Sequence, residues 1–276
     1  MTLVAVWTVQ GRMYAIADTR LSRERGNVLT EHGPKLLPLT VVCRQPGESG
    51  EFDKIVFKMD FGFAYSGSTL SALASQVLAN TLFANLAGNL GALPPTLAEI
   101  SHAVGAISFE YMRDVGQLAG MSGQFKAIVF GFCVRSAKYR AFIILPRIDG
   151  GQFLVDVIEH DQSEAAIIGS CPDLLRARIR ADNEERVARG DTHPVLDIDA
   201  PRRALQALID ENADETIGGS VQQAWATPAG FLVVGNMRPI VPRPPSTRNA
   251  GLFVLGFDTF DIRNIGDHQV IMRAGR

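Results

Sequence analysis

The chain has 276 residues, of which 46% are hydrophobic and 20% are charged. A chain of this length and composition can bury one sizeable core and could form one large or two small soluble domains, of which we favour one. The 27 basic residues nearly balance the 29 acidic ones and are scattered along the sequence, which argues against nucleic acid or an anionic membrane as a partner.

The first part of the chain is predicted to form strands and then two helices. The four expected strands are residues 2–9, 12–18, 35–44 and 54–65. Gln10-Gly11, between the first two, is typical of a tight hairpin turn. One helix is expected over residues 68–86, with a serine at its start, and a second begins at Thr96, where Thr96 and Glu99 form a capping-box pattern.

The second part of the chain repeats this order. Three strands, two helices and two further strands are expected over residues 126–134, 139–145, 153–159, 173–188, 201–212, 220–226 and 230–234. Strands and paired helices in this order do not alternate as βαβ units, which argues against a doubly wound parallel sheet. We therefore predict an α+β fold, a layered sandwich of two antiparallel sheets between helices.

The C-terminal segment differs from the rest in composition. Four prolines, at positions 239, 242, 244 and 245, favour polyproline II before apolar residues return at 252–257. We expect residues 1–238 to form the domain and residues 239–276 to form an extension that packs on it or on a neighbouring subunit.

The cysteines and the start of the chain bear on where the protein works. Cys43, Cys133 and Cys171 are odd in number, far apart and without metal-ligand spacing, which favours a reducing compartment and no metal site. No basic region precedes the apolar residues 2–9, and no apolar run is long enough to span a bilayer. We expect a cytoplasmic protein that uses no cofactor.

Several short polar and glycine-containing motifs follow one another along the chain. They are Thr2, Ile16-Ala17-Asp18-Thr19-Arg20, Gly33-Pro34-Lys35, Tyr65-Ser66-Gly67-Ser68, Gly169-Ser170 and Asp214-Glu215-Thr216-Ile217-Gly218-Gly219-Ser220-Val221. In this order and near these spacings, over about residues 2–234, the set resembles the proteasome β-subunit family of N-terminal-nucleophile hydrolases. The resemblance implies a four-layer αββα sandwich, in agreement with the predicted order of strands and helices.

The resemblance implies that Thr2 is the nucleophile of an amide hydrolase once Met1 has been removed. The free α-amine of Thr2 would then serve as the base, because such an amine has a pKa of about 7.7–8.0 and is poised near working pH. Lys35 would supply a cation that favours the alkoxide, and Asp18 would hold its ammonium. From the residues alone, the favoured interpretation of Asp18, Arg20 and Lys35 is a solvated salt bridge at the ends of strands.

Other positions acquire roles from the same resemblance. Gly67 matches the residue whose N–H binds the oxyanion, and Ser170 and Asp214 match residues that support the amine and a proton relay. The structural alternatives are a turn glycine for Gly67, a helix N-cap for Ser170 and a C-terminal helix residue for Asp214.

Substrate contacts are implied as well. Ser22 and Thr69 match residues whose main chain binds an extended peptide. Tyr65 matches a residue that lines the pocket for the side chain before the scissile bond, although it could equally belong to the core.

One departure from the family bears on activity. Ile217 stands where the family has a serine before the double glycine, so one supporting hydrogen bond, worth on the order of 1 kcal/mol, is expected to be missing. The leading interpretation is a threonine peptidase that acts on peptides or unfolded protein inside a homo-oligomeric ring. A small-molecule amidase and an inactive scaffold subunit are the alternatives. Because the sequence has no phosphate-binding glycine loop, any ATP-driven unfolding would come from a separate unfoldase.

Overall fold

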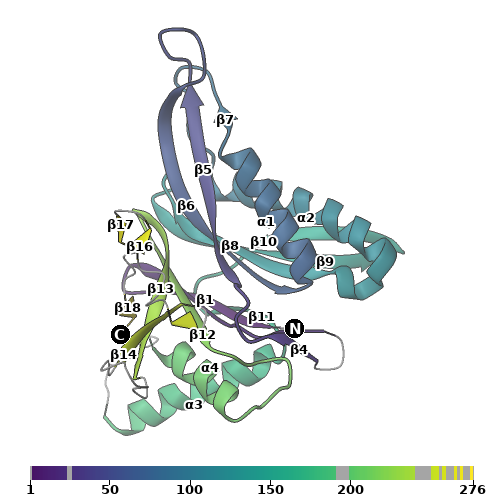
Figure 1. Ribbon diagram of the computed structural model, residues 1–276, viewed down its shortest axis with the longest axis vertical. Helices are drawn as coiled ribbons and strands as arrows, with labels where there is room; N and C mark the ends of the chain where they lie inside the picture. The colour runs from purple at the N-terminus through teal and green to yellow at the C-terminus, as the bar shows by residue number, and fades with distance from the viewer. Residues whose placement is uncertain are drawn as a thin grey trace.

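The computed structural model describes residues 2–23, 27–190, 199–239, 250–254, 257–258, 264–265, 268–269 and 274–275 (Figure 1). These residues form two large, mainly antiparallel sheets and four helices, which confirms the predicted α+β class. Within them, no helix combines the length and the apolar character needed to cross a lipid bilayer.

The first sheet contains the start of the chain. Its strands, in spatial order, are β11 (Ala166–Gly169), β1 (Leu3–Val9), β2 (Arg12–Asp18), β12 (Val221–Thr227), β13 (Gly230–Pro239), β14 (Ala250–Val254) and β15 (Phe257–Asp258), with β18 (Ala274–Gly275) also paired to β13. The predicted hairpin between β1 and β2 is confirmed, because Val9 pairs with Arg12 and both turn residues have positive φ.

The second sheet and its helices come from the middle of the chain. The strand order is β10 (Gln152–Glu159), β9 (Lys138–Asp149), β8 (Phe125–Cys133), β6 (Lys54–Gly67), β5 (Leu36–Gln45) and β7 (Leu86–Ala87). Helix α1 (Thr69–Phe83) ends earlier than predicted, because residues 86–87 pair with β5 instead. Helix α2 (Leu97–Ala119) has the predicted capping box, with Thr96 and Glu99 each accepting a bond from the other's backbone, and the short 3-10 turn η2 (Gly120–Gly123) follows it.

Two further helices and two small ribbons complete the fold. Helices α3 (Pro172–Ala188) and α4 (Ala200–Asp210) agree with the predicted second pair. Strand β3 (Leu21–Ser22) pairs with β4 (Val28–Thr30), and β16 (Asn264–Ile265) pairs with β17 (His268–Gln269). The sequence did not indicate β3, β4, β7 or β11, which are all four residues or shorter.

Three apolar clusters hold these elements together. One joins α1 and α2 to the second sheet, one lies between the two sheets, and one joins α3 and α4 to the first sheet. Strand β1 serves two of them, because Val4 and Val6 lie in the cluster between the sheets whereas Leu3 and Ala5 lie in the cluster with α3 and α4. Its apolar run from Leu3 to Trp7 is typical of a strand buried on both faces. Strand β1 is therefore fixed deep in the molecule.

The predicted boundary between residues 238 and 239 falls inside β13, one residue before the strand ends at Pro239. Strand β14 then pairs with β13, with Met237 opposite Leu252 and Arg238 opposite Gly251, so this part of the tail extends the first sheet. The prolines at 242, 244 and 245 lie outside the described residues.

The end of β11 approaches the start of β1 unusually closely. Gly169 pairs with Leu3 and has a φ of 121°, a conformation that other residues rarely adopt. A Cβ atom at this position would lie 1.7 Å from the carbonyl oxygen of Thr2. Only glycine leaves room for the backbone of Thr2 where it is.

We expect Gly169→Ala to destabilise the protein, with roughly 1–3 kcal/mol lost to backbone strain and the clash with Thr2 adding to the loss. The matched control is Gly116→Ala in α2, where an added Cβ meets no atom within 4 Å and should stabilise the helix by about 0.5–1 kcal/mol. Urea unfolding of both variants measures the difference. Equal stabilities of the two variants would contradict this account of Gly169.

Candidate active site

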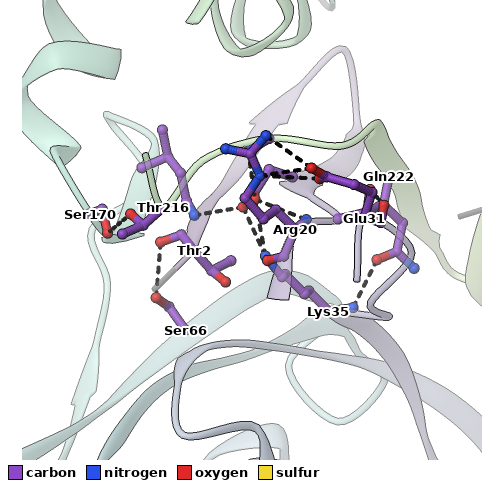
Figure 2. Close-up of polar contacts among 12 residues, drawn as sticks. Thr2, Arg20, Glu31, Lys35, Ser66, Ser170, Thr216 and Gln222 are labelled. Carbon is purple, nitrogen blue, oxygen red and sulfur yellow. Dashed lines mark hydrogen bonds and ion pairs between the residues drawn. The ribbon is translucent and has the colours of Figure 1, made fainter. Parts of the chain in front are cut away.

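Thr2 lies immediately before β1 and is only 3% exposed. Its carbonyl oxygen accepts a hydrogen bond from the hydroxyl of Ser66 in β6, at 2.9 Å, and another from the backbone N–H of Ser170 after β11, also at 2.9 Å. Figure 2 shows Thr2 between these groups, with Ser170 to one side and Lys35 to the other. Both large sheets therefore contribute to the position of Thr2.

Asp18, at the end of β2, forms an ion pair with Lys35, which precedes β5. The Lys35 Nζ atom lies 3.1 Å from each carboxylate oxygen, and both side chains are 0% exposed. Asp18 Oδ1 also accepts the N–H of Leu3 at 2.9 Å, which ties the pair to the residue next to Thr2. The solvated salt bridge that the residues alone favoured is thus wrong, because this pair is fully buried.

The charge of Lys35 follows from its hydrogen bonds. Nζ donates to both oxygens of Asp18 and to the carbonyl oxygen of Arg20, so three acceptors surround three N–H bonds. Burial lowers the pKa of Lys35 to about 8, although the Asp18 carboxylate beside it acts in the opposite direction. Burial also raises the pKa of Asp18, against the Lys35 charge and the N–H groups of Leu3 and Gly218. Lys35 is therefore a fixed cation below about pH 8.

Two side chains hold the backbone on either side of Lys35. The amide oxygen of Gln222, in β12, accepts the N–H of Lys35 at 2.9 Å and that of Leu36 at 3.0 Å. The hydroxyl of Tyr65 donates to the carbonyl oxygen of Pro34 at 2.9 Å. Tyr65 is 1% exposed and packs in the cluster with α1 and α2, and burial raises its pKa to about 12. Of the two roles considered for Tyr65, the structure favours the core.

Ser170 and Asp214 meet through Thr216, a residue that the sequence did not single out as part of the site. The Thr216 hydroxyl lies 2.8 Å from Ser170 Oγ and is also hydrogen-bonded to Asp214 Oδ1. The structural alternatives for the predicted pair are wrong. The N-cap of α3 is Cys171, not Ser170, and Asp214 lies beyond the end of α4 at Asp210.

Ile217 has a structural role that explains its side chain. It is 0% exposed and packs in the cluster between the first sheet and helices α3 and α4. The hydroxyl that contacts Ser170 and Asp214 comes instead from Thr216, one residue earlier.

Gly67 ends β6 directly after Ser66, so it lies at the same end of the sheet as Thr2. Its φ is 118°, and a Cβ atom there would lie 2.6 Å from the carbonyl oxygen of Gln124. Ser68 then caps α1 by accepting the N–H of Ser71. The turn role expected of this glycine is confirmed, and its contact with an oxyanion stays a prediction.

The two residues expected to bind a peptide through their main chain are partly exposed. Ser22 belongs to the ribbon of β3 and β4, and Thr69 is the first residue of α1. Their contacts with substrate stay predictions.

Two solved structures share the fold of this chain. An Anbu mutant from Hyphomicrobium sp. strain MC1 is 18% identical, with 85% of this chain and 85% of that chain covered and a TM-score of 0.52. Anbu from Pseudomonas aeruginosa, in a helical assembly, is 15% identical, with 84% of this chain and 85% of that chain covered and a TM-score of 0.55. At these identities the likeness shows the fold alone. The sequence matches no protein-family model and no curated protein.

Ser66, Thr216 and Gln222 are the polar side chains of this site that sequence reasoning missed. A signal for Ser66 exists, since successive side chains of a strand point to opposite faces. With Tyr65 directed into the cluster of α1 and α2, Ser66 must face the other sheet, where Thr2 lies. Thr216 reaches Ser170 across 46 positions of sequence and Gln222 reaches Lys35 across 187, and no local pattern indicates these two contacts.

We expect Lys35→Met to lower the free energy of unfolding by about 3–5 kcal/mol, because it leaves the Asp18 carboxylate buried without its counter-charge. The double variant Asp18→Asn/Lys35→Met should lose less than the sum of the two single variants, since it removes both charges. The control is Arg147→Met, which breaks an exposed ion pair with Asp156 and should cost at most about 1 kcal/mol. Urea unfolding near pH 7 tests this, and similar losses for Lys35→Met and Arg147→Met would argue against a buried charge pair.

Proposed function

We propose that the protein is a threonine-type hydrolase of amide bonds, with Thr2 as its nucleophile after removal of Met1. The observation that carries this proposal is the buried Asp18–Lys35 pair. Its carboxylate accepts the N–H of Leu3, the residue next to Thr2. The proposal includes the four-layer αββα arrangement of such hydrolases, which the three apolar clusters support.

The proposed reaction begins with the hydroxyl of Thr2. Lys35 has its three N–H bonds directed at acceptors, so it suits the role of a cation rather than a base. The α-amine of Thr2 therefore takes the hydroxyl proton as Oγ attacks the amide carbon. The negative charge that develops on the carbonyl oxygen is bound by the N–H of Gly67. The ammonium then gives the proton to the leaving amine, and water hydrolyses the ester that remains.

We further propose a peptide or unfolded protein as the substrate, with Ser22 and Thr69 binding it through their main chain and a separate ATP-dependent unfoldase as a partner. The same proposal places the protein in the cytoplasm. Its fold neighbour from Pseudomonas aeruginosa forms a helical assembly, which supports self-association of this chain as well.

We expect the naturally expressed protein to start at Thr2 and to form a covalent adduct with a peptide epoxyketone, because this reagent bonds to a hydroxyl and an amine on the same residue. Intact-mass measurement reads the loss of one methionine and the gain of one inhibitor. Thr2→Ala should form no adduct, whereas Thr2→Ser, which keeps both groups, should form one. A chain that correctly starts at Thr2 and forms no adduct would favour the inactive scaffold.

Helix α1 carries a surface suited to self-association. Leu70, Val77 and Leu82 are 68%, 60% and 48% exposed, so the outer side of this helix is largely apolar. The β5–β6 hairpin projects beyond the helices in Figure 1, and Phe52 and Ile55 near its tip are also exposed. Several exposed apolar side chains on one helix, as on α1, are typical of a surface that is covered in an assembly.

We expect Val77→Glu to break or weaken the assembly, because it would bury an unpaired carboxylate at the contact. Val187→Glu in α3 is the matched control, since Val187 is 61% exposed and Val77 is 60% exposed. Both variants should keep the stability of the parent within about 0.5 kcal/mol. Size-exclusion chromatography with light scattering tests this. A parent that is monomeric, or an assembly unchanged by Val77→Glu, would contradict the proposal.

A further inference from the structure

A short chain of hydrogen bonds lies beside Thr2 on the side away from Lys35 (Figure 2). Ser170 Oγ and Thr216 Oγ1 are 2.8 Å apart, and Thr216 Oγ1 is also bonded to Asp214 Oδ1. The backbone N–H of Thr216 donates to the same carboxylate oxygen at 2.8 Å, and the thiol of Cys171 donates to the other at 3.2 Å. The backbone N–H of Ser170 meanwhile holds the carbonyl oxygen of Thr2.

The direction of these bonds follows from counting hydrogens. Burial raises the pKa of Asp214, but the hydrogen bonds from Thr216 and Cys171 outweigh it and hold that pKa below its ordinary value. Asp214 is therefore an ionised carboxylate at neutral pH and can only accept. The single hydroxyl hydrogen of Thr216 must point to Asp214, so towards Ser170 the Thr216 oxygen can only accept. It follows that Ser170 donates its hydroxyl hydrogen to Thr216.

The direction of this bond makes the Ser170 hydroxyl a hydrogen-bond acceptor towards Thr2. With its hydrogen turned to Thr216, the Ser170 oxygen has its remaining lone pairs free to accept. We propose that Thr216 is a positioning residue, which orients the Ser170 hydroxyl so that it accepts a hydrogen bond from the α-ammonium of Thr2. This inference rests on the proposed function, because only a chain that starts at Thr2 has that ammonium.

Thr216 and Ser170 would act at the step of the reaction in which the α-amine of Thr2 is protonated. The proton leaves Oγ of Thr2 as the bond to the substrate carbon forms, stays on the α-ammonium, and passes to the leaving amine when the carbon–nitrogen bond breaks. Ser170 stabilises the ammonium in between, while Thr216 and the Asp214 charge keep the hydroxyl from rotating. Residue 217 cannot do this here, because Ile217 packs among α3 and α4.

The test uses Thr216→Val, which replaces the hydroxyl by a methyl group of similar size. The matched controls are Thr216→Ser, which keeps the hydroxyl, and Thr216→Val/Ile217→Ser, which puts a hydroxyl at the following position. Removal of Met1 is first verified by mass for every variant. Two quantities are then measured against pH, namely the rate of adduct formation with the epoxyketone and the reactivity of the Thr2 amine towards a small acylating reagent, read by peptide mass spectrometry.

We expect Thr216→Val to slow adduct formation about five- to ten-fold, the effect of one lost hydrogen bond. The midpoint of amine reactivity should move to lower pH, because the ammonium loses an ordered acceptor. Thr216→Ser should match the parent in both, and the added serine at 217 should restore neither. Ser170→Ala should move the amine midpoint in the same direction, which provides a second variant if Thr216→Val does not fold.

Two results would overturn the inference. One is an amine midpoint in Thr216→Val equal to that of the parent, and the other is rescue by the serine at 217. The failure of the proposed function looks different. In that case the parent would form no adduct. The Thr2 amine would still titrate, so the effect of the Thr216 hydroxyl on its midpoint could still be measured.

Discussion

The buried pair of Asp18 and Lys35 is the interaction on which the candidate site depends. Removing two charges from water costs several kcal/mol per ion, so such a pair is tolerated only when its other hydrogen bonds are satisfied. Here Asp18 accepts N–H groups of Leu3, Arg20 and Gly218 as well as the Lys35 ammonium. The start of β1, the end of β2 and the loop before β12 are therefore fixed around one carboxylate.

Much of the fold could be predicted from the sequence because its larger elements have local signals. The hairpin of β1 and β2 follows from apolar runs around Gln10-Gly11, and the start of α2 follows from Thr96 and Glu99. Strands β7 and β11 could not be found in this way. They have two and four residues and exist only because β5 and β1, distant in sequence, offer them a free edge.

The candidate site also contains residues that the sequence predicts and residues that it does not. Thr2, Asp18 and Lys35 stand in a motif order that resembles a known family, and the structure brings the Asp18–Lys35 pair to the backbone of Leu3. Thr216 could not be predicted from that pattern, because the family has its serine one residue later. Which of the two neighbouring residues faces Ser170 depends on how the loop after α4 turns, and this is decided by the packing of Ile217 against α3 and α4.

That loop joins the two halves of the site. At one end Thr216 contacts both Asp214 and Ser170, and at the other the N–H of Gly218 donates to Asp18 at 3.2 Å. Arg20 reinforces the connection, because its guanidinium donates to the carbonyl oxygen of Glu215 while its own carbonyl oxygen accepts from Lys35. A backbone shift in the loop would therefore disturb the cation and the Ser170 hydroxyl together. Loss of the Thr216 hydroxyl alone removes no backbone contact of the loop, so this change tests the role proposed for Thr216 separately from the stability of the buried pair.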